Sequence, residues 1–198
     1  IPRGQWLVQT AAGSALGRMI IRLGKATGFK TFNVVRHERT VEELHRLGAD
    51  HVEVFDETRH TPEQLSAAVR RTMGSPEPGL RYAIDAVGGA TGSAVIQCLG
   101  QTGKMLAYGT LSNEPLVFSS RVLMTTGSRV EGFWLGSYMT NIGLLSKLRL
   151  VNRLTNLIQS GVLQTHIAQT YSFDQFAAAV EASEDSSVRG KVLLRPAN

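Results

Sequence analysis

Residues 6–17 read Trp6-Leu-Val-Gln-Thr-Ala-Ala-Gly-Ser-Ala-Leu-Gly17, a short run of β-formers followed by a turn of small residues. An apolar repeat at helical spacing begins in that turn and predicts a helix over residues 15–27. A strand that passes through a small-residue turn into a helix is typical of parallel α/β sheets. The free amides at the N-terminus of such a helix can bind an anion.

The chain after this unit continues to alternate between strand and helix. Five more β-like runs predict strands at residues 31–35, 51–55, 81–87, 103–108 and 130–134. Helical patterns occupy residues 40–47, 61–73, 92–99 and 141–159. Thr40 with Glu43, and Thr61 with Gln64, have the spacing of capping boxes. Six strands joined by helices predict an α/β fold with a doubly wound, parallel six-stranded sheet.

The C-terminal part of the chain does not extend this sheet. After Gly161 come an extended segment through Tyr171, a helix over residues 174–184 and a strand over residues 191–194, with a loop at Ser186-Ser187. We therefore expect two units, residues 1–160 and residues 161–198, the second being part of another layer.

Composition narrows the classes of function. With 42% hydrophobic and 19% charged residues the chain can bury a core, so disorder is not expected. The single cysteine, Cys98, excludes an intrachain disulfide framework and a cysteine-rich zinc site, so we expect no metal and a reducing cytoplasm. No signal peptide or membrane span is evident. The net charge of +5 can attract nucleic acid or a phosphorylated small molecule.

The turn at residues 11–17 has the spacing of a dinucleotide-binding turn. Ala12, Ser14 and Gly17 occupy the positions of G-x-G-x-x-G, which serve the tight bend, the approach of a pyrophosphate and the packing of helix on strand. Two of the three glycines are replaced, so a packing turn without a ligand is the alternative. The preceding strand and following helix favour a Rossmann dinucleotide-binding unit.

The residues at the end of the second strand indicate which dinucleotide would bind. NAD-binding units carry Asp or Glu there, about 20 residues after the turn, for the ribose hydroxyls. This chain has Arg36 and His37, with Arg39 close by. A guanidinium binds phosphate oxygens in pairs, whereas a carboxylate would repel them. The pattern predicts NADPH as cofactor, unless Arg36 is merely an exposed loop residue.

Further motifs occur along the chain. They are Asn33-Val34-Val35-Arg36, Leu47-Gly48-Ala49-Asp50-His51-Val52, Asp85-Ala86-Val87-Gly88-Gly89, Gly132-Phe133-Trp134-Leu135 and Gly190-Lys191-Val192-Leu193-Leu194. Through them the chain resembles, over essentially its whole length, the medium-chain dehydrogenase/reductase superfamily. Within it the chain is most similar to zinc-independent enoyl thioester reductases, then to quinone reductases.

The resemblance implies roles for individual residues. The pyrophosphate would face Gly13, Ser14, Ala15, Leu16 and Gly17, and the 2′-phosphate would face Arg36, His37 and Glu38. The nicotinamide end would meet Tyr108 and Gly109, under Phe133, Trp134 and Leu135. Lys191 would reach a cofactor phosphate or the carboxamide. From the residues alone the glycines could be turn residues, the aromatic pair could be core or interface, and Lys191 could be solvated. Thr110-Leu111 departs from the pattern of the family at the end of the fifth strand.

The resemblance also implies a missing part. Members of the family begin with a GroES-like catalytic domain, which the C-terminal segment completes and which holds the catalytic Tyr or the zinc ligands. We therefore expect this chain to be the NADPH-binding portion of a reductase of activated C=C bonds, such as an enoyl thioester or enone, and to be inactive alone. Its catalytic residues are not predicted.

Other functions stay open. A quinone reductase or a zinc-dependent alcohol dehydrogenase would use the same scaffold, and the basic charge permits an NADPH-sensing or nucleic-acid-binding module. A methyltransferase-like fold usually has an acid near Arg36, which argues against it. The edge of the sixth strand would otherwise be exposed, so we expect a homodimer through it.

Overall fold

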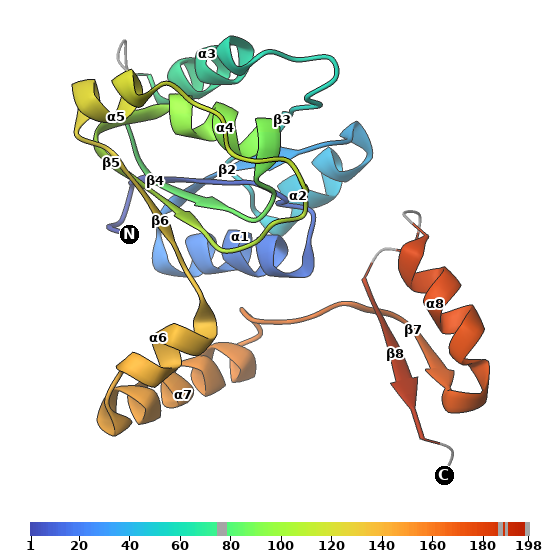
Figure 1. The fold of residues 1–198 in the computed structure, drawn as a ribbon. Coiled ribbons are helices and arrows are strands. Elements are labelled where there is room, and N and C mark those ends of the chain that lie inside the picture. Colours follow the sequence, from blue (N-terminus) through green and yellow to red (C-terminus); the bar gives the residue numbers. More distant parts are fainter. Residues whose placement is uncertain (75–78, 186–187, 189, 197–198) are drawn as a thin grey trace.

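Six parallel strands form one sheet in the order β3-β2-β1-β4-β5-β6 (Figure 1). This is a computed structural model, and it describes residues 1–74, 79–185, 188 and 190–196. The strands are β1 Trp6–Gln9, β2 Lys30–Val35, β3 His51–Val54, β4 Leu80–Asp85, β5 Leu99–Ala107 and β6 Arg129–Gly132. The order reverses beside β1, so the predicted doubly wound Rossmann sheet is confirmed and its switch point lies between β1 and β4.

Helices cover both faces of the sheet (Figure 1). One face carries α1 Ala15–Thr27 and α2 Val41–Leu47, and the other carries α3 Pro62–Met73, α4 Gly89–Gln97 and α5 Ser120–Thr126. The smaller core, under α1 and α2, contains Ala12, Ile21, Val35, Leu44 and Ala49. The larger core, under α3 to α5, is centred on residues such as Phe32, Leu65, Leu80, Ile96 and Met105. Burial of these two apolar sets fixes the helices on the sheet.

The starts of the helices test the predicted capping boxes. At α3 the backbone amide of Thr61 donates to Gln64 Oε1 at 2.8 Å, which confirms that box. The box at Thr40 is wrong. A 3-10 turn, Glu38–Thr40, precedes α2, so Thr40 is already helical and its hydroxyl donates instead to the carbonyl of His37 at 3.0 Å.

Several elements differ from the sequence patterns. β5 begins at Leu99 and passes Thr102, which has a positive φ of 54°, before the predicted start. Two helices, α5 and α6 Leu135–Asn141, were not predicted. The helix predicted over residues 141–159 is α7 Leu144–Gln159, which starts later because Ile142 and Gly143 are extended, with ψ of 141° and 160°.

The C-terminal segment forms a separate β-α-β unit. β7 Ile167–Ser172 pairs in parallel with β8 Lys191–Arg195, a short 3-10 turn Phe173–Gln175 follows β7, and α8 Phe176–Glu184 packs on both strands. These strands make their own two-stranded sheet, as expected for a segment that does not extend the main one. The domain boundary at residue 160 stays a prediction, and the loop predicted at Ser186-Ser187 lies outside the described residues.

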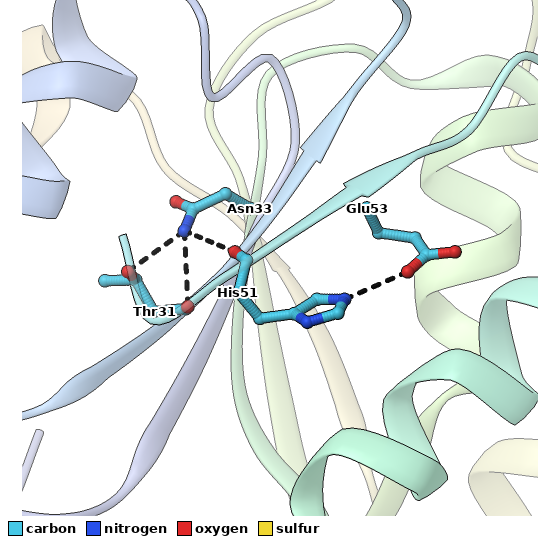
Figure 2. A network of polar contacts seen from close by, with 4 residues as sticks. All are labelled: Thr31, Asn33, His51 and Glu53. Carbon is cyan, nitrogen blue, oxygen red and sulfur yellow. Dashed lines mark hydrogen bonds and ion pairs between the residues drawn. The ribbon is translucent and has the colours of Figure 1, made fainter. Parts of the chain in front are cut away.

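A buried polar network ties the first three strands together, and Figure 2 shows its part on β2 and β3. The side-chain amide of Asn33 donates to the Thr31 hydroxyl at 3.0 Å and to the His51 carbonyl at 2.8 Å. Gln9 donates to Asn33 Oδ1 at 2.6 Å and to the Gly17 carbonyl at 3.0 Å. Because buried polar groups are costly unless paired, this network fixes the register of β1 to β3 and anchors the first turn of α1.

Candidate cofactor site

The turn between β1 and α1 presents unbonded amides. Ser14 is the N-cap of α1, and its hydroxyl oxygen accepts a hydrogen bond from the amide of Gly17 at 3.1 Å. The amides of Ala15 and Leu16 precede the first intrahelical bond and keep the N-terminal end of the helix dipole open to an anion. Leu16 itself is exposed. The predicted pyrophosphate position therefore has donors, although one of them is taken by Ser14.

Gly17 has a packing role. A Cβ built on it would lie 2.5 Å from the carbonyl oxygen and 2.6 Å from the Cα of Ala12. No side chain fits against backbone at that distance, so α1 can approach β1 only through a glycine. Gly13 differs, because a Cβ there would meet only Thr40 Cγ2, at 3.6 Å. Gly17 thus matches the predicted third position of the turn.

A cavity of about 420 Å³ opens over this turn. Its charged walls are Arg18 and Arg22 of α1, Arg36 and Arg39 after β2, and Lys191 of β8. Gly13, Ser14, Ala15, His37 and His166 also line it. Among the described residues that line the cavity there is no Asp or Glu. Arg18 is paired with Glu43 at 3.1 Å, and the other four cations around this small cavity favour an anionic ligand with more than one charged group.

Arg36 directly follows β2, in the predicted position, and its positive charge acts on the carboxylate of Asp56. The pKa of Asp56 is lowered, first by hydrogen bonds from the Thr58 hydroxyl and amide, and further by the positive charges of Arg36 and Arg59. Arg36 is exposed and lies at the mouth of the cavity. An incoming phosphate would compete with Asp56 for its charge. Glu38 lies in the 3-10 turn and is not part of the cavity wall.

The C-terminal unit reaches the same cavity. Arg22 Nη1 of α1 donates to the Gln164 carbonyl at 2.9 Å, and the amide of Lys191 donates to the His166 carbonyl at 2.8 Å. Gly190 has a φ of +127°, and a Cβ on it would lie 2.7 Å from the His166 oxygen. Glycine therefore allows β8 to start close to His166, which places Lys191 on the cavity, and its contact with a cofactor stays a prediction.

The ends of β4 and β1 are joined by a buried carboxylate. Asp85 accepts from the Thr10 hydroxyl at 2.6 Å and from the amides of Val87 and Gly88 at 3.1 and 2.9 Å. Asp85 is fully buried. These bonds hold the turn after β4 at the switch point, where ligands of open α/β sheets bind.

Tyr108 and Gly109 follow β5 at the same edge of the sheet but do not line the cavity over the first turn. A Cβ on Gly109 would lie 2.8 Å from the carbonyl oxygen of Ala86, so this glycine packs β5 against β4. Burial, and the negative charge of Asp85, raise the pKa of the half-buried Tyr108 phenol.

Phe133, Trp134 and Leu135 lie apart from that cavity as well. They join β6 to α6, and Trp134 and Leu135 are mostly exposed. The Phe133 ring packs 5.6 Å from that of Tyr138. The amide of Phe133 donates to the Ala107 carbonyl at 2.7 Å, which keeps this segment beside the end of β5. Their predicted contact with a nicotinamide stays a prediction.

A second cavity, of about 360 Å³, was not predicted from the sequence. It lies between the ends of β2, β3 and β4 and shares Ala11, Val35 and Arg36 with the first. Its other walls are Val34, Phe55, Glu57, Val87, Thr91, Leu111 and Ser112. Phe55 and Val87 lie within two residues of the ends of β3 and β4, so the rule that ligands bind at the carboxyl ends of parallel strands could have identified these two.

In the described part of the chain, no three His, Cys, Asp or Glu side chains are grouped so that they could hold a metal ion. No helix among these residues has the length and apolar character needed to cross a membrane.

Comparison with known proteins agrees with this architecture. The profile of a family described as zinc-binding dehydrogenase matches residues 47–194. The human mitochondrial enoyl-[acyl-carrier-protein] reductase is 28% identical over 195 residues, which are 96% of this chain and 50% of that protein. The chain thus spans about half the length of the curated relatives it matches.

Two solved structures share the fold. The complex of Etr1p with NADP and crotonyl-CoA superimposes with a TM-score of 0.78 at 22% identity, over 94% of this chain and 53% of that one. A mycobacterial quinone oxidoreductase gives a TM-score of 0.82 at 19% identity, over 97% and 56%.

Proposed function

Since this chain belongs to the zinc-binding dehydrogenase family, as a nucleotide-binding portion of an oxidoreductase, we propose that it binds NADPH for the reduction of an activated C=C bond. The observation that carries the proposal is the cavity over the first turn, where Arg36 takes the place of the acid found in NAD-binding units. Arg39 and Lys191 add charge to the same wall.

The residues fit such a dinucleotide in two places. Ser14 and the amides of Ala15 and Leu16, at the N-terminus of α1, suit the pyrophosphate. Arg36 and Lys191 suit the 2′-phosphate, because each offers donors and positive charge at the cavity wall. NADPH, when bound, supplies the hydride, and this chain orients it and neutralises its phosphates.

The substrate is proposed from the relatives. The human protein is named for an enoyl thioester on a carrier protein, and Etr1p was solved with crotonyl-CoA. In such a reduction the hydride adds to the β-carbon and a proton adds to the α-carbon. Because the chain spans about half the length of these relatives, we propose that the proton donor lies in a part of the protein outside these 198 residues.

The substrate, and the need for a part of the protein beyond these 198 residues, are tested together on the longest natural form of the protein. We expect it to oxidise NADPH with crotonyl-CoA, and the 198-residue chain to bind NADPH with little or no turnover. Turnover by the 198-residue chain alone would contradict the proposal that the proton donor lies outside it. Turnover with a quinone but not with an enoyl thioester would favour the quinone reductases, the second candidate that the mycobacterial structure supports.

The edge of the sheet supports a further proposal about assembly. Among the described strands, β6 pairs only with β5 and ends the sheet, so its other side is open to a second copy. We propose a homodimer through β6, which sedimentation would test. A cytoplasmic location also stays a proposal, since it rests on cysteine content alone.

A further inference from the structure

The second cavity is joined to the first at a wall that both share. Arg36, Val35 and Ala11 line both, so a ligand that contacts Arg36 from the first cavity stands at the entrance of the second. The inference drawn below rests on the proposed function, because it concerns which part of NADPH enters the second cavity.

The chemistry of the two cavities differs. The first is lined by cations, whereas Val34, Phe55, Val87 and Leu111 give the second mainly apolar walls. In NADPH the 2′-phosphate and the purine are attached to the same ribose. A 2′-phosphate on Arg36 therefore leaves the purine one sugar away, and the flat, largely apolar base fits the second cavity better than the cationic one.

The second cavity contains one acid. Glu57 lies just after β3, and its Oε2 accepts a hydrogen bond from the hydroxyl of Thr91, in α4, at 3.2 Å. Thr91 is buried and Glu57 is exposed, so the threonine holds one end of a carboxylate that would otherwise move freely. An ionised carboxylate only accepts hydrogen bonds, and it has lone pairs left after the bond from Thr91.

An acceptor of this kind distinguishes purines by the group on C6. Adenine carries an amino group there, which donates, whereas a 6-oxopurine carries a carbonyl, which a carboxylate repels. We propose that Glu57, held by Thr91, accepts a hydrogen bond from the exocyclic amino group of adenine and makes the site selective for adenine dinucleotides over 6-oxopurine dinucleotides. The competing view is that Glu57 only ties the end of β3 to α4.

The test compares NADPH with its hypoxanthine analogue, which has a carbonyl in place of the amino group. Dissociation constants are measured by nucleotide fluorescence for the wild type, Glu57→Gln and Thr91→Val. Glu181→Gln is the matched control, because Glu181 is exposed on α8 and lines neither cavity. Urea midpoints of all variants check that each is folded.

We expect the wild type and the control to prefer NADPH by about tenfold, which is the contribution expected from one hydrogen bond to a charged group at an exposed rim. Glu57→Gln should bring the two affinities within about twofold, since a carboxamide can also donate to the carbonyl. Thr91→Val should give an intermediate ratio. A wild type that binds NADPH but does not prefer it, or a Glu57→Gln ratio equal to that of the wild type, overturns the inference. Failure to bind NADPH at all would instead contradict the proposed function.

Discussion

Substitution of Gly17 by alanine tests how the first turn is built. The added Cβ would lie 2.5 to 2.7 Å from the carbonyl oxygen, Cα and carbonyl carbon of Ala12. All three are backbone atoms of a turn that β1 and the Gln9 network hold in place. The methyl group therefore cannot be accommodated by a side-chain rotation, and α1 must move away from the sheet.

The expected cost follows from two opposing effects. Overpacking in a well-packed core costs about 1–3 kcal/mol, and a clash with backbone belongs at the upper end of that range. Alanine in a helix gains about 1 kcal/mol over glycine. The free energy of unfolding should therefore fall by about 2 kcal/mol. With an m value of about 2 kcal/mol/M, the urea midpoint should fall by about 1 M.

Urea unfolding followed by the fluorescence of Trp6, in β1, gives the measurement. Gly13→Ala is the matched control in the same turn, because its Cβ would meet only Thr40, at an ordinary 3.6 Å. Its stability should stay within about 0.5 kcal/mol of the wild type. A Gly17→Ala variant as stable as Gly13→Ala would refute the packing role of this glycine.

Three smaller predictions follow from neighbouring groups. Asp56→Asn should strengthen binding of NADPH relative to NADH by about two- to threefold in titrations, because the carboxylate of Asp56 no longer competes for Arg36. An unchanged ratio of the two affinities would argue against coupling between Arg36 and Asp56. Burial raises the pKa of the Cys98 thiol to about 12, so iodoacetamide should label this thiol only when the chain unfolds. Above about pH 9 only the unfolded thiol ionises, so the free energy of unfolding should fall as the pH rises further. Rapid labelling of the native chain would contradict this. Asp85→Asn turns one of the acceptor oxygens into a donor that faces other donors. The free energy of unfolding, measured with heat or urea, should therefore fall by about 1–3 kcal/mol. A variant as stable as the wild type would mean that Thr10 and the two amides find other partners.

Much of the fold follows from local pattern. The alternation of apolar strand runs and amphipathic helices predicts the six-stranded sheet, because each pattern reports which face of an element is buried. Arg36 and Lys191 could be placed at the site from the sequence and the resemblance together, since both follow or begin a strand. The short helix α6 was not predicted, and α7 begins later than predicted, because neither helix has a side-chain cap that marks its start.

The missing parts of the site depend on tertiary packing. Arg18 and Arg22 read as ordinary helix cations, and only the approach of the C-terminal unit makes them walls of a cavity. Thr40 has the spacing of an N-cap, yet a 3-10 turn includes it, and Glu43 of α2 pairs with Arg18 at 3.1 Å. Glu57 and Thr91 are distant in sequence, and neither belongs to a motif, so their contact was not predictable from local pattern.

The central claim is that Arg36 makes the cavity over the first turn selective for a 2′-phosphate, and parallel titrations with NADPH and NADH test it most directly. The wild type should bind NADPH more tightly by about 10- to 100-fold, the range expected for charge-assisted hydrogen bonds to one phosphate. Arg36→Asp should remove the preference, whereas Arg71→Asp, an exposed position in α3 away from both cavities, should keep it. Equal affinity of the wild type for NADH and NADPH would contradict the account.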